Sequence, residues 1–297
     1  MTVFEANLRG IGYLLVSIVA FILNDTLIKL VSARLPPGEI LVLRGGFALA
    51  IILVLLVMRG DHRQWRLAVS PLIAWRTVGE VGTTIFYLYA LFHMPIANVS
   101  AIAQIVPLMT TAAAAIFLGE AVGRPRWLAI AVGFVGVMII MRPGLDGFDA
   151  YSLAALASMA LVSMRDLLTR RLPAALPTLL VTAISTGAVA LSGIALSFSE
   201  TWPAPSGEDL MLLAAAGSLL LVGYGTVILA MRYGEMSVMA PFRYSVILFA
   251  IALGYGVWGD VPDTATILGT VIVVGSGLFT LDHERRLARR LAMQTSG

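Results

Sequence analysis

The most constraining feature of the sequence is a succession of apolar stretches of about 20 residues, separated by short breaks that contain glycine, proline or charge. Of the 297 residues, 59% are hydrophobic and 12% are charged, and the mean hydropathy is +0.92. A soluble domain has about 25% charged residues, and one aqueous core cannot bury this much apolar surface. The sequence therefore predicts an all-α integral membrane protein.

Ten of these stretches are long enough to cross the hydrocarbon core of a bilayer as helices. They are 9–31, 38–58, 70–92, 96–118, 125–142, 150–170, 177–199, 208–232, 236–258 and 264–282. The connections between them are short and leave no room for a soluble domain. We therefore predict ten transmembrane helices and a function located within the bilayer.

Basic residues near the ends of these stretches predict their orientation, because Lys and Arg are retained on the cytoplasmic side. One set of alternate ends carries Arg9, Arg59, Arg63, Arg66, Arg124, Arg126, Arg170, Arg171, Arg232, Arg285, Arg286, Arg289 and Arg290. The opposite set carries Lys29, Arg34 and Arg142. Both termini are expected in the cytoplasm, with 285–297 as a basic tail, and the membrane is expected to be a bacterial cytoplasmic (inner) membrane.

The chain also resembles itself. One alignment of the two halves places Ser17, Asn24, Asp25 and Lys29 over Ser158, Arg165, Asp166 and Arg170, and another places Ala90, Gly119 and Glu120 over Ala230, Gly259 and Asp260. Because each half has five predicted helices, an odd number, the second half starts on the opposite face of the membrane. This predicts two inverted-topology repeats, 1–147 and 148–284, the architecture that recurs in secondary transporters.

Several motifs resemble the drug/metabolite transporter superfamily of the EamA type. The segment from Pro107 through its small residues to Gly119-Glu120, and Gly133-Phe-Val-Gly136 after it, fit the family pattern, as does Leu43-Arg44-Gly45-Gly46. In the second half, Asp260 stands where Glu is usual and Ile247 stands at the place equivalent to Pro107. The resemblance implies a ten-helix transporter fold and a small-metabolite substrate that it does not identify.

Ionisable residues inside the predicted helices are the strongest functional signal, because a charge within a bilayer is costly and is usually paired. Asp25 and Arg44 are each about six residues from the outer ends of their helices, so both lie about 9 Å below the surface. We expect them to pair, with Asn24 beside them. Two roles remain open: the pair binds substrate, or it only joins the two helices.

Further charges lie nearer the inner side or the middle of the membrane. Arg165 is assigned a structural role, in an ion pair or reaching the lipid phosphates, and Arg243, close to Pro241, is expected to bind substrate. Arg76 and Glu80 are four residues apart and can pair along one helix face. The proton-coupling candidates are Glu80, Asp25 and Asp166.

Tyrosine hydroxyls in an apolar bundle need a polar partner, so tyrosines inside the predicted helices are candidates to line a polar cavity. Gln104, beside Pro107, is a further candidate. The predicted substrate-binding residues are Asn24, Asp25, Arg44, Tyr87, Gln104, Tyr224, Arg243 and Tyr244.

Signatures of other protein classes were not found. The chain has no cysteine, no phosphate-binding loop, no dinucleotide fingerprint, no zinc-protease motif and no nucleophile elbow. We predict no cofactor, no metal site and no nucleic-acid partner.

These observations favour a secondary active transporter of a small organic metabolite that works by alternating access. Interior arginines suit a carboxylate or phosphate and interior acids suit an amine, which favours an amino acid or related zwitterion. The alternatives are a nucleotide-related compound, a vitamin or a quaternary amine as substrate, or a membrane-embedded enzyme acting on a lipid-linked substrate. The coupling ion is proton or sodium, membrane lipids surround the protein, and the protein is a monomer or homodimer.

Overall fold

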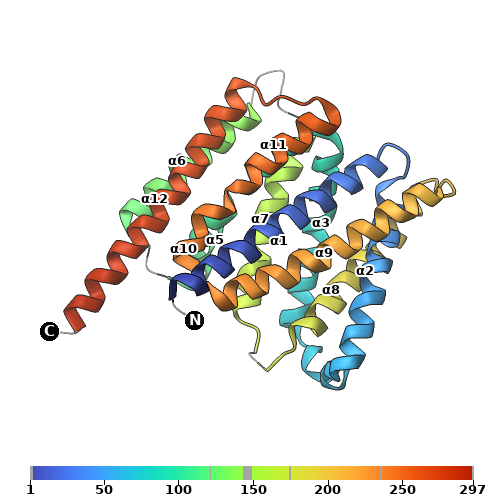
Figure 1. Cartoon of the computed structure of the whole chain (residues 1–297), viewed down its shortest axis with the longest axis horizontal. Coiled ribbons are helices and arrows are strands. Elements are labelled where there is room, and N and C mark those ends of the chain that lie inside the picture. The colour runs from blue at the N-terminus through green and yellow to red at the C-terminus, as the bar shows by residue number, and fades with distance from the viewer. Residues whose placement is uncertain (1–2, 121, 143–148, 174, 235, 296–297) are drawn as a thin grey trace. The chain divides into compact units, whose positions relative to one another are not determined.

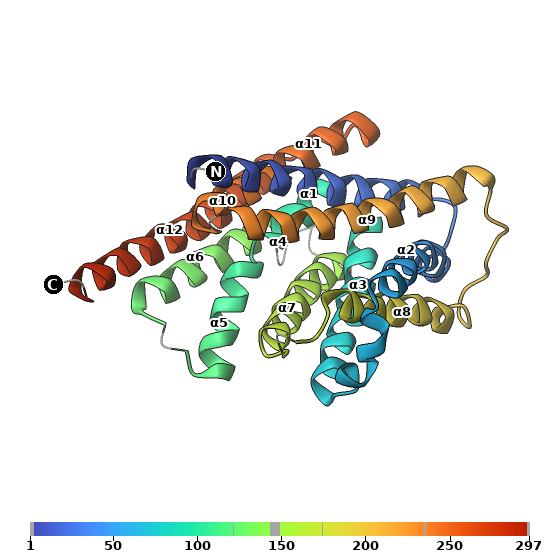
Figure 2. The same cartoon turned by 60° about the horizontal axis from the view of Figure 1, so that its bottom comes forward.

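The computed structural model describes residues 3–120, 122–142, 149–173, 175–234 and 236–295, and these residues form helices and short connections without a strand. The predicted all-α class is confirmed. In chain order (Figures 1 and 2) the helices are α1 (Val3–Val31), α2 (Pro37–Arg59), η1 (Asp61–Ala68), α3 (Pro71–His93), α4 (Ile96–Ala103), α5 (Val106–Leu118), α6 (Arg124–Met141), α7 (Ala150–Arg170), α8 (Thr178–Leu196), α9 (Gly207–Tyr233), α10 (Met236–Arg243), α11 (Ser245–Trp258) and α12 (Thr264–Thr295).

Nine segments of the described residues are long and apolar enough to cross a membrane. They correspond to the predicted segments except for 70–92, whose helix α3 carries Arg76 and Glu80 in its interior. Large apolar side chains are exposed on the helices, among them Met58 (76%) and Phe117 (76%). Such a surface suits lipid and not water. The count of ten spans stays a prediction.

The chain divides into two compact units that interleave along the sequence. Unit 1 consists of Met1–Val19, Pro95–Ser152 and Gly225–Gly297, and unit 2 consists of Ala20–Met94 and Leu153–Tyr224. Each unit therefore combines segments from both halves of the chain. The predicted boundary between repeats 1–147 and 148–284 falls in 143–148, outside the described residues, so that division stays a prediction.

In unit 2, α2 lies beside α8 in both views of the chain (Figures 1 and 2). Small residues permit the close approach. A Cβ atom on Gly193 would be 2.5 Å from the carbonyl oxygen of Gly38, and one on Gly45 would be 3.0 Å from Cβ of Ala190. Backbone-to-backbone packing of this kind is a usual source of helix association in lipid.

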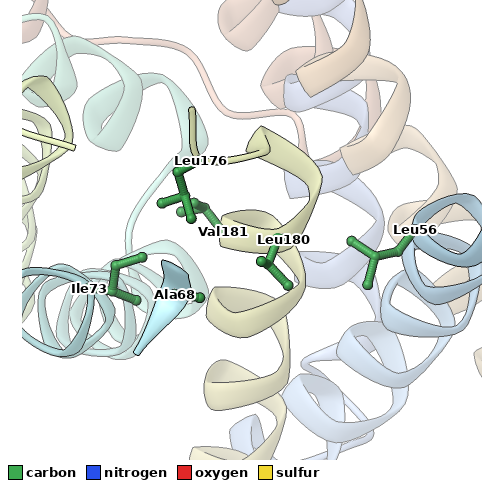
Figure 3. Packing of buried hydrophobic residues seen from close by; sticks show 6 residues of the cluster. All are labelled: Leu56, Ala68, Ile73, Leu176, Leu180 and Val181. Carbon is green, nitrogen blue, oxygen red and sulfur yellow. The ribbon is translucent and has the colours of Figure 1, made fainter. Parts of the chain in front are cut away.

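The connection from α2 to α3 fixes the direction of α3. Gly60 ends α2 with φ of 75°, a left-handed conformation that glycine adopts without strain. The short helix η1 follows, and the Ser70 hydroxyl accepts the Ile73 N–H at the start of α3. Figure 3 shows the apolar cluster that holds this corner against α8: Leu56, Ala68, Ile73, Leu176, Leu180 and Val181. The cluster thereby positions α2, α3 and α8, which carry much of the candidate site.

In unit 1, α6 lies beside α12 (Figures 1 and 2), again through glycine contacts. A Cβ atom on Gly269 would be 2.5 Å from the Gly136 carbonyl oxygen. A second apolar cluster in this unit consists of Leu14, Ile18, Ala230 and Met239.

Two of the predicted spans are interrupted at equivalent positions in unit 1. The stretch 96–118 breaks after α4, at Gln104 and Ile105, before Pro107 near the start of α5. The stretch 236–258 breaks at Tyr244, three residues after Pro241 in α10. Pro107 donates no backbone N–H, so it removes one helical hydrogen bond across the first break. Pro241 precedes the second break, so the breaks coincide although the prolines do not.

We expect Gly193→Ala to lower the free energy of unfolding by about 1–3 kcal/mol, the usual cost of overpacking, because the new Cβ would meet the Gly38 carbonyl. Gly46→Ala is the matched control, since a Cβ at Gly46 meets nothing within 4 Å. Apparent melting temperatures in detergent measure both. A Gly193→Ala protein that melts as high as the wild type would contradict the close α2–α8 contact.

Asp263, in the connection before α12, provides a pH-dependent contribution to stability. Its carboxylate accepts the Thr266 N–H at 2.8 Å and pairs with Arg142, and these interactions hold the pKa of Asp263 below its usual value of 3.8. We expect Asp263→Ala to cost about 0.5–2 kcal/mol at neutral pH, as for other lost helix caps. Because the folded-state pKa is depressed, the difference from the wild type should shrink as pH falls below about 4. Asp263→Asn, which keeps the cap acceptor, should lose less, and melting curves across pH test all three proteins.

Candidate functional site

Three polar side chains of unit 2 lie along one face of α3. Arg76, Glu80 and Tyr87 recur at intervals of four and seven residues, which is about one and two helical turns. Each contacts a side chain from another element of unit 2. Helix α3, which carries this polar face, is not among the nine described segments that are apolar enough to cross a membrane. The contacts made by this face of α3 form two groups, one around Asp25 and one around Glu80.

The Asp25 cluster consists of Asn24, Asp25, Arg44 and Tyr87. Tyr87 donates its hydroxyl to Asp25 Oδ2 at 2.6 Å, and the Asn24 amide donates to Asp25 Oδ1 at 2.9 Å. Both partners of the carboxylate are therefore uncharged. Asp25 itself is half-buried, and none of the cationic side chains that the structure describes forms an ion pair with it.

Arg44 occupies the other side of Asn24. It is 8% exposed, and Nη1 donates to Asn24 Oδ1 at a long 3.4 Å. Its Nε–H is buried and has no hydrogen-bond partner among the described residues. A buried guanidinium donor without an acceptor is costly. Arg44 therefore has unused capacity to bind an anionic or carbonyl oxygen.

The sequence allowed a direct Asp25–Arg44 ion pair, and the described residues do not form one. Asn24 bridges the two charged groups instead, with its amide nitrogen on Asp25 and its amide oxygen on Arg44. Equal depth in the membrane placed the side chains close together, but depth alone does not fix which atoms meet. The Asp25 carboxylate and the Arg44 guanidinium can therefore each bind a further charged or polar group.

The Glu80 cluster consists of Arg76, Glu80, Arg165 and Asp166. Glu80 receives Arg76 Nη2 at 3.5 Å and Arg165 Nη1 at 3.2 Å, and Arg165 Nη2 is 2.8 Å from Asp166. The first three side chains are 13–20% exposed. Two positive and two negative groups therefore compensate one another in direct contacts, which is how a bundle satisfies interior charge.

Two hydroxyl groups complete the Glu80 cluster. Arg76 donates from Nε to Thr169 Oγ1 at 3.0 Å and from Nη1 to Ser185 Oγ at 2.5 Å. The cluster thereby joins α3, α7 and α8. Arg165 pairs inside the protein, so the alternative in which it reaches lipid phosphates does not describe this structure.

A third polar group surrounds the start of α2 and was missed from the sequence. Arg34 contacts Asp209 at 2.6 Å, and both oxygens of Glu200 accept the Gly38 N–H, at 3.0 and 3.2 Å. Glu39 is 3% exposed, and its Oε2 has no hydrogen-bond partner among the described residues. Glu39 was not among the residues singled out from the sequence. The sequence does show that Glu39 directly follows Pro36-Pro37-Gly38. It does not show that a segment distant in the sequence buries this side chain.

The other predicted site residues are divided between the two units. Tyr224, in unit 2, packs edge-on against Phe21 with ring centroids 5.2 Å apart. In unit 1, Gln104 donates to the Ser100 carbonyl of the preceding turn, the Tyr244 hydroxyl lies against Gly277, and Arg243 is exposed. Their role in substrate binding stays a prediction.

The Asp25 cluster can bind opposite charges a short distance apart. Asp25 offers a carboxylate whose contacts are neutral, and Arg44 offers a guanidinium N–H without an acceptor. The Glu80 cluster, in contrast, is compensated internally. The chemistry available is therefore recognition of a small polar molecule inside an apolar helical bundle, which is a property of membrane transporters.

Comparison with known proteins agrees with this class. The chain belongs to the EamA-like transporter family, which it matches twice, over residues 8–142 and 150–281. It is therefore an integral multi-pass membrane protein of the drug/metabolite transporter superfamily, as the sequence motifs predicted.

Curated relatives carry different substrates. The chain is 27% identical to the S-adenosylmethionine uptake transporter of Rickettsia conorii, covering 96% of this chain and 97% of the relative. It is 28% identical to the pseudopaline exporter of Pseudomonas aeruginosa, covering 89% and 93%. It is 25% identical to the riboflavin transporter of Vibrio cholerae, covering 98% of each.

A crystal structure with 22% sequence identity matches with a TM-score of 0.63, covering 93% of this chain and 98% of that chain, and supports the fold alone. The named relatives are transporters of small metabolites. The family and these relatives identify the chain as a small-metabolite transporter and not an enzyme.

We expect Glu80→Gln to destabilise the protein by about 3–5 kcal/mol, because it leaves Arg76 and Arg165 without their shared carboxylate. Asp166→Asn is the control, since Asp166 is 40% exposed and its ion pair among the described residues is with Arg165. It should cost about 1 kcal/mol or less. Melting temperatures of the two variants in one detergent make the comparison, and equal losses would contradict a central role for Glu80.

Proposed function

We propose that the protein is a secondary active transporter of an amino acid or related zwitterion. The supporting observation is the Asp25 cluster, where Asn24 separates a carboxylate from a buried guanidinium and neither charge has a direct counter-ion. A substrate ammonium group would contact Asp25, and a substrate carboxylate would contact the Nε–H of Arg44. Charge-assisted hydrogen bonds of this kind are stronger than neutral ones.

The relatives supply candidate substrates for this site. S-adenosylmethionine, named for the Rickettsia relatives, has an α-amino and an α-carboxyl group and fits the two charges. Riboflavin, named for other relatives, has neither group. We therefore rank S-adenosylmethionine and free amino acids above vitamins, nucleotide-related compounds and quaternary amines. A membrane-embedded enzyme is not retained as an alternative.

We further propose alternating access between two inverted repeats of five helices each. Three features support the repeats. Helices α4 and α10 are of equal length, with 8 residues each, and both precede a break. Gly119 and Gly259 end α5 and α11 with φ of 69° and 73°. Equivalent helices, α2 with α8 and α6 with α12, pack together within their units.

We also propose that both termini lie in the cytoplasm, that the membrane is a bacterial inner membrane, and that the coupling ion is proton or sodium. Among the proposed proton carriers we favour Asp25, because Glu80 and Asp166 already contact arginines. A monomer or homodimer would suffice, since the cluster forms within one chain.

A ligand screen followed by liposome transport tests the function. Purified protein is screened by thermal shift against amino acids, S-adenosylmethionine, riboflavin and quaternary amines, since a ligand of the folded state raises apparent stability. A compound that stabilises is then tested for counterflow in liposomes under imposed proton and sodium gradients. If Arg44 holds the carboxylate, the methyl ester of that compound should bind more than tenfold more weakly. Binding of riboflavin with no binding of any zwitterion would refute the substrate assignment.

We expect Asp25→Asn to weaken binding of the zwitterion about 10- to 100-fold, the usual range for loss of a hydrogen bond to a charged group. The melting temperature should stay close to that of the wild type, because asparagine still accepts the Tyr87 hydroxyl. Asp166→Asn makes the same charge change outside the Asp25 cluster and should leave affinity unchanged. An equal loss of affinity in both variants would indicate a general electrostatic effect and not a contact at Asp25.

A further inference from the structure

The start of α2 carries a buried carboxyl group that the proposed transport site does not use. Glu39 is 3% exposed, and the described residues provide neither a hydrogen bond to its Oε2 nor an ion pair. An isolated carboxylate removed from water is strongly unfavourable, and such groups become neutral instead. The Oε2 atom therefore lacks a partner, which a proton or a cation could supply.

The surroundings of Glu39 are acidic. Glu200 lies over the start of α2, where it accepts the N–H of the adjacent Gly38, and both Glu200 and Asp209 are within electrostatic reach of Glu39. The positive group of this region, Arg34, contacts Asp209 and Glu208. Like charges nearby disfavour a further negative charge.

The other elements packed against α2 do not supply a counter-ion for Glu39. Helix α8, which packs along α2, has no ionisable side chain between Thr178 and Leu196. Helix η1 packs against the opposite end of α2, so its charges are remote. Arg44 is on α2 itself, one and a half turns deeper, and donates to Asn24. Lys29 donates to the Met94 carbonyl.

A metal ion suits this place less well than a proton does. A cation such as Ca²⁺ or Na⁺ takes several oxygen ligands, but the neighbouring carboxylate oxygens are occupied. Those of Glu200 accept the Gly38 N–H and the Trp202 indole N–H. Those of Asp209 accept Arg34 and Ser206. A proton needs none of these ligands.

We propose that Glu39 is a proton-binding site, and that its bound proton stabilises the packing of the start of α2 against the segment that carries Glu200 and Asp209. The site is separate from the Asp25 cluster and does not depend on the identity of the substrate. According to the predicted topology, it lies at the outer end of α2. There it would exchange its proton with the outside of the cell when the start of α2 separates from that segment.

The direct test is infrared spectroscopy of the whole protein in lipid, because a protonated carboxyl group has a carbonyl stretching band distinct from that of a carboxylate. We expect one such band at neutral pH that is lost in Glu39→Gln and retained in Glu208→Gln. Glu208 is the matched control, since it belongs to the same region but is 71% exposed. An unchanged spectrum in Glu39→Gln would overturn the proposal.

The pH dependence of stability gives a second readout. An acid that is protonated when folded stabilises the protein at low pH and loses that contribution as pH rises. The melting temperature of the wild type should therefore fall relative to that of Glu39→Gln as the pH rises. Glu200→Gln keeps Glu39 but removes a negative charge near it. In this variant the fall in melting temperature should therefore occur at lower pH than in the wild type. Parallel curves for all three proteins would overturn the proposal whether or not transport is observed.

Discussion

The lack of water around most of this chain is the constraint on which the rest of its structure depends. Every charged group inside an apolar bundle must find a partner within the protein or hold a proton. The Glu80 cluster meets this requirement with direct contacts between two arginines and two acids. Because these contacts come from α3 and α7, with Ser185 from α8, charge compensation also fixes how the helices of unit 2 are joined.

Polar groups that are left incompletely compensated stand out against this background. Three such groups lie in unit 2: the Arg44 Nε–H, the Asp25 carboxylate with its uncharged hydrogen-bond partners, and the carboxyl of Glu39. In contrast to the paired charges of the Glu80 cluster, such groups are reasonable places for substrates and protons to bind. The same physical requirement therefore produces both the stable contacts and the proposed binding sites.

Glycine contacts serve the other structural requirement, close packing without a strong hydrophobic driving force. Gly38 and Gly193 bring α2 to α8, and Gly136 and Gly269 bring α6 to α12. Each contact joins helices that occupy equivalent places in the two halves. The proposed duplication of a five-helix unit would account for the repeated glycine contacts and for the matching breaks at Gln104 and Tyr244.

The sequence by itself determined the membrane environment and the all-α class, because a helix satisfies the backbone polar groups of a long apolar run within lipid. Its motifs indicated the family. It also identified Asp25, Arg44 and Glu80 as interior charges, since hydropathy shows where a charge interrupts a span. It did not determine which charges meet. Only the tertiary structure placed Asn24 between Asp25 and Arg44, brought Arg165 to Glu80 across 85 residues of sequence, and buried Glu39 beneath a distant segment. Those contacts depend on how helices rotate and pack, which the period of a single helix does not record.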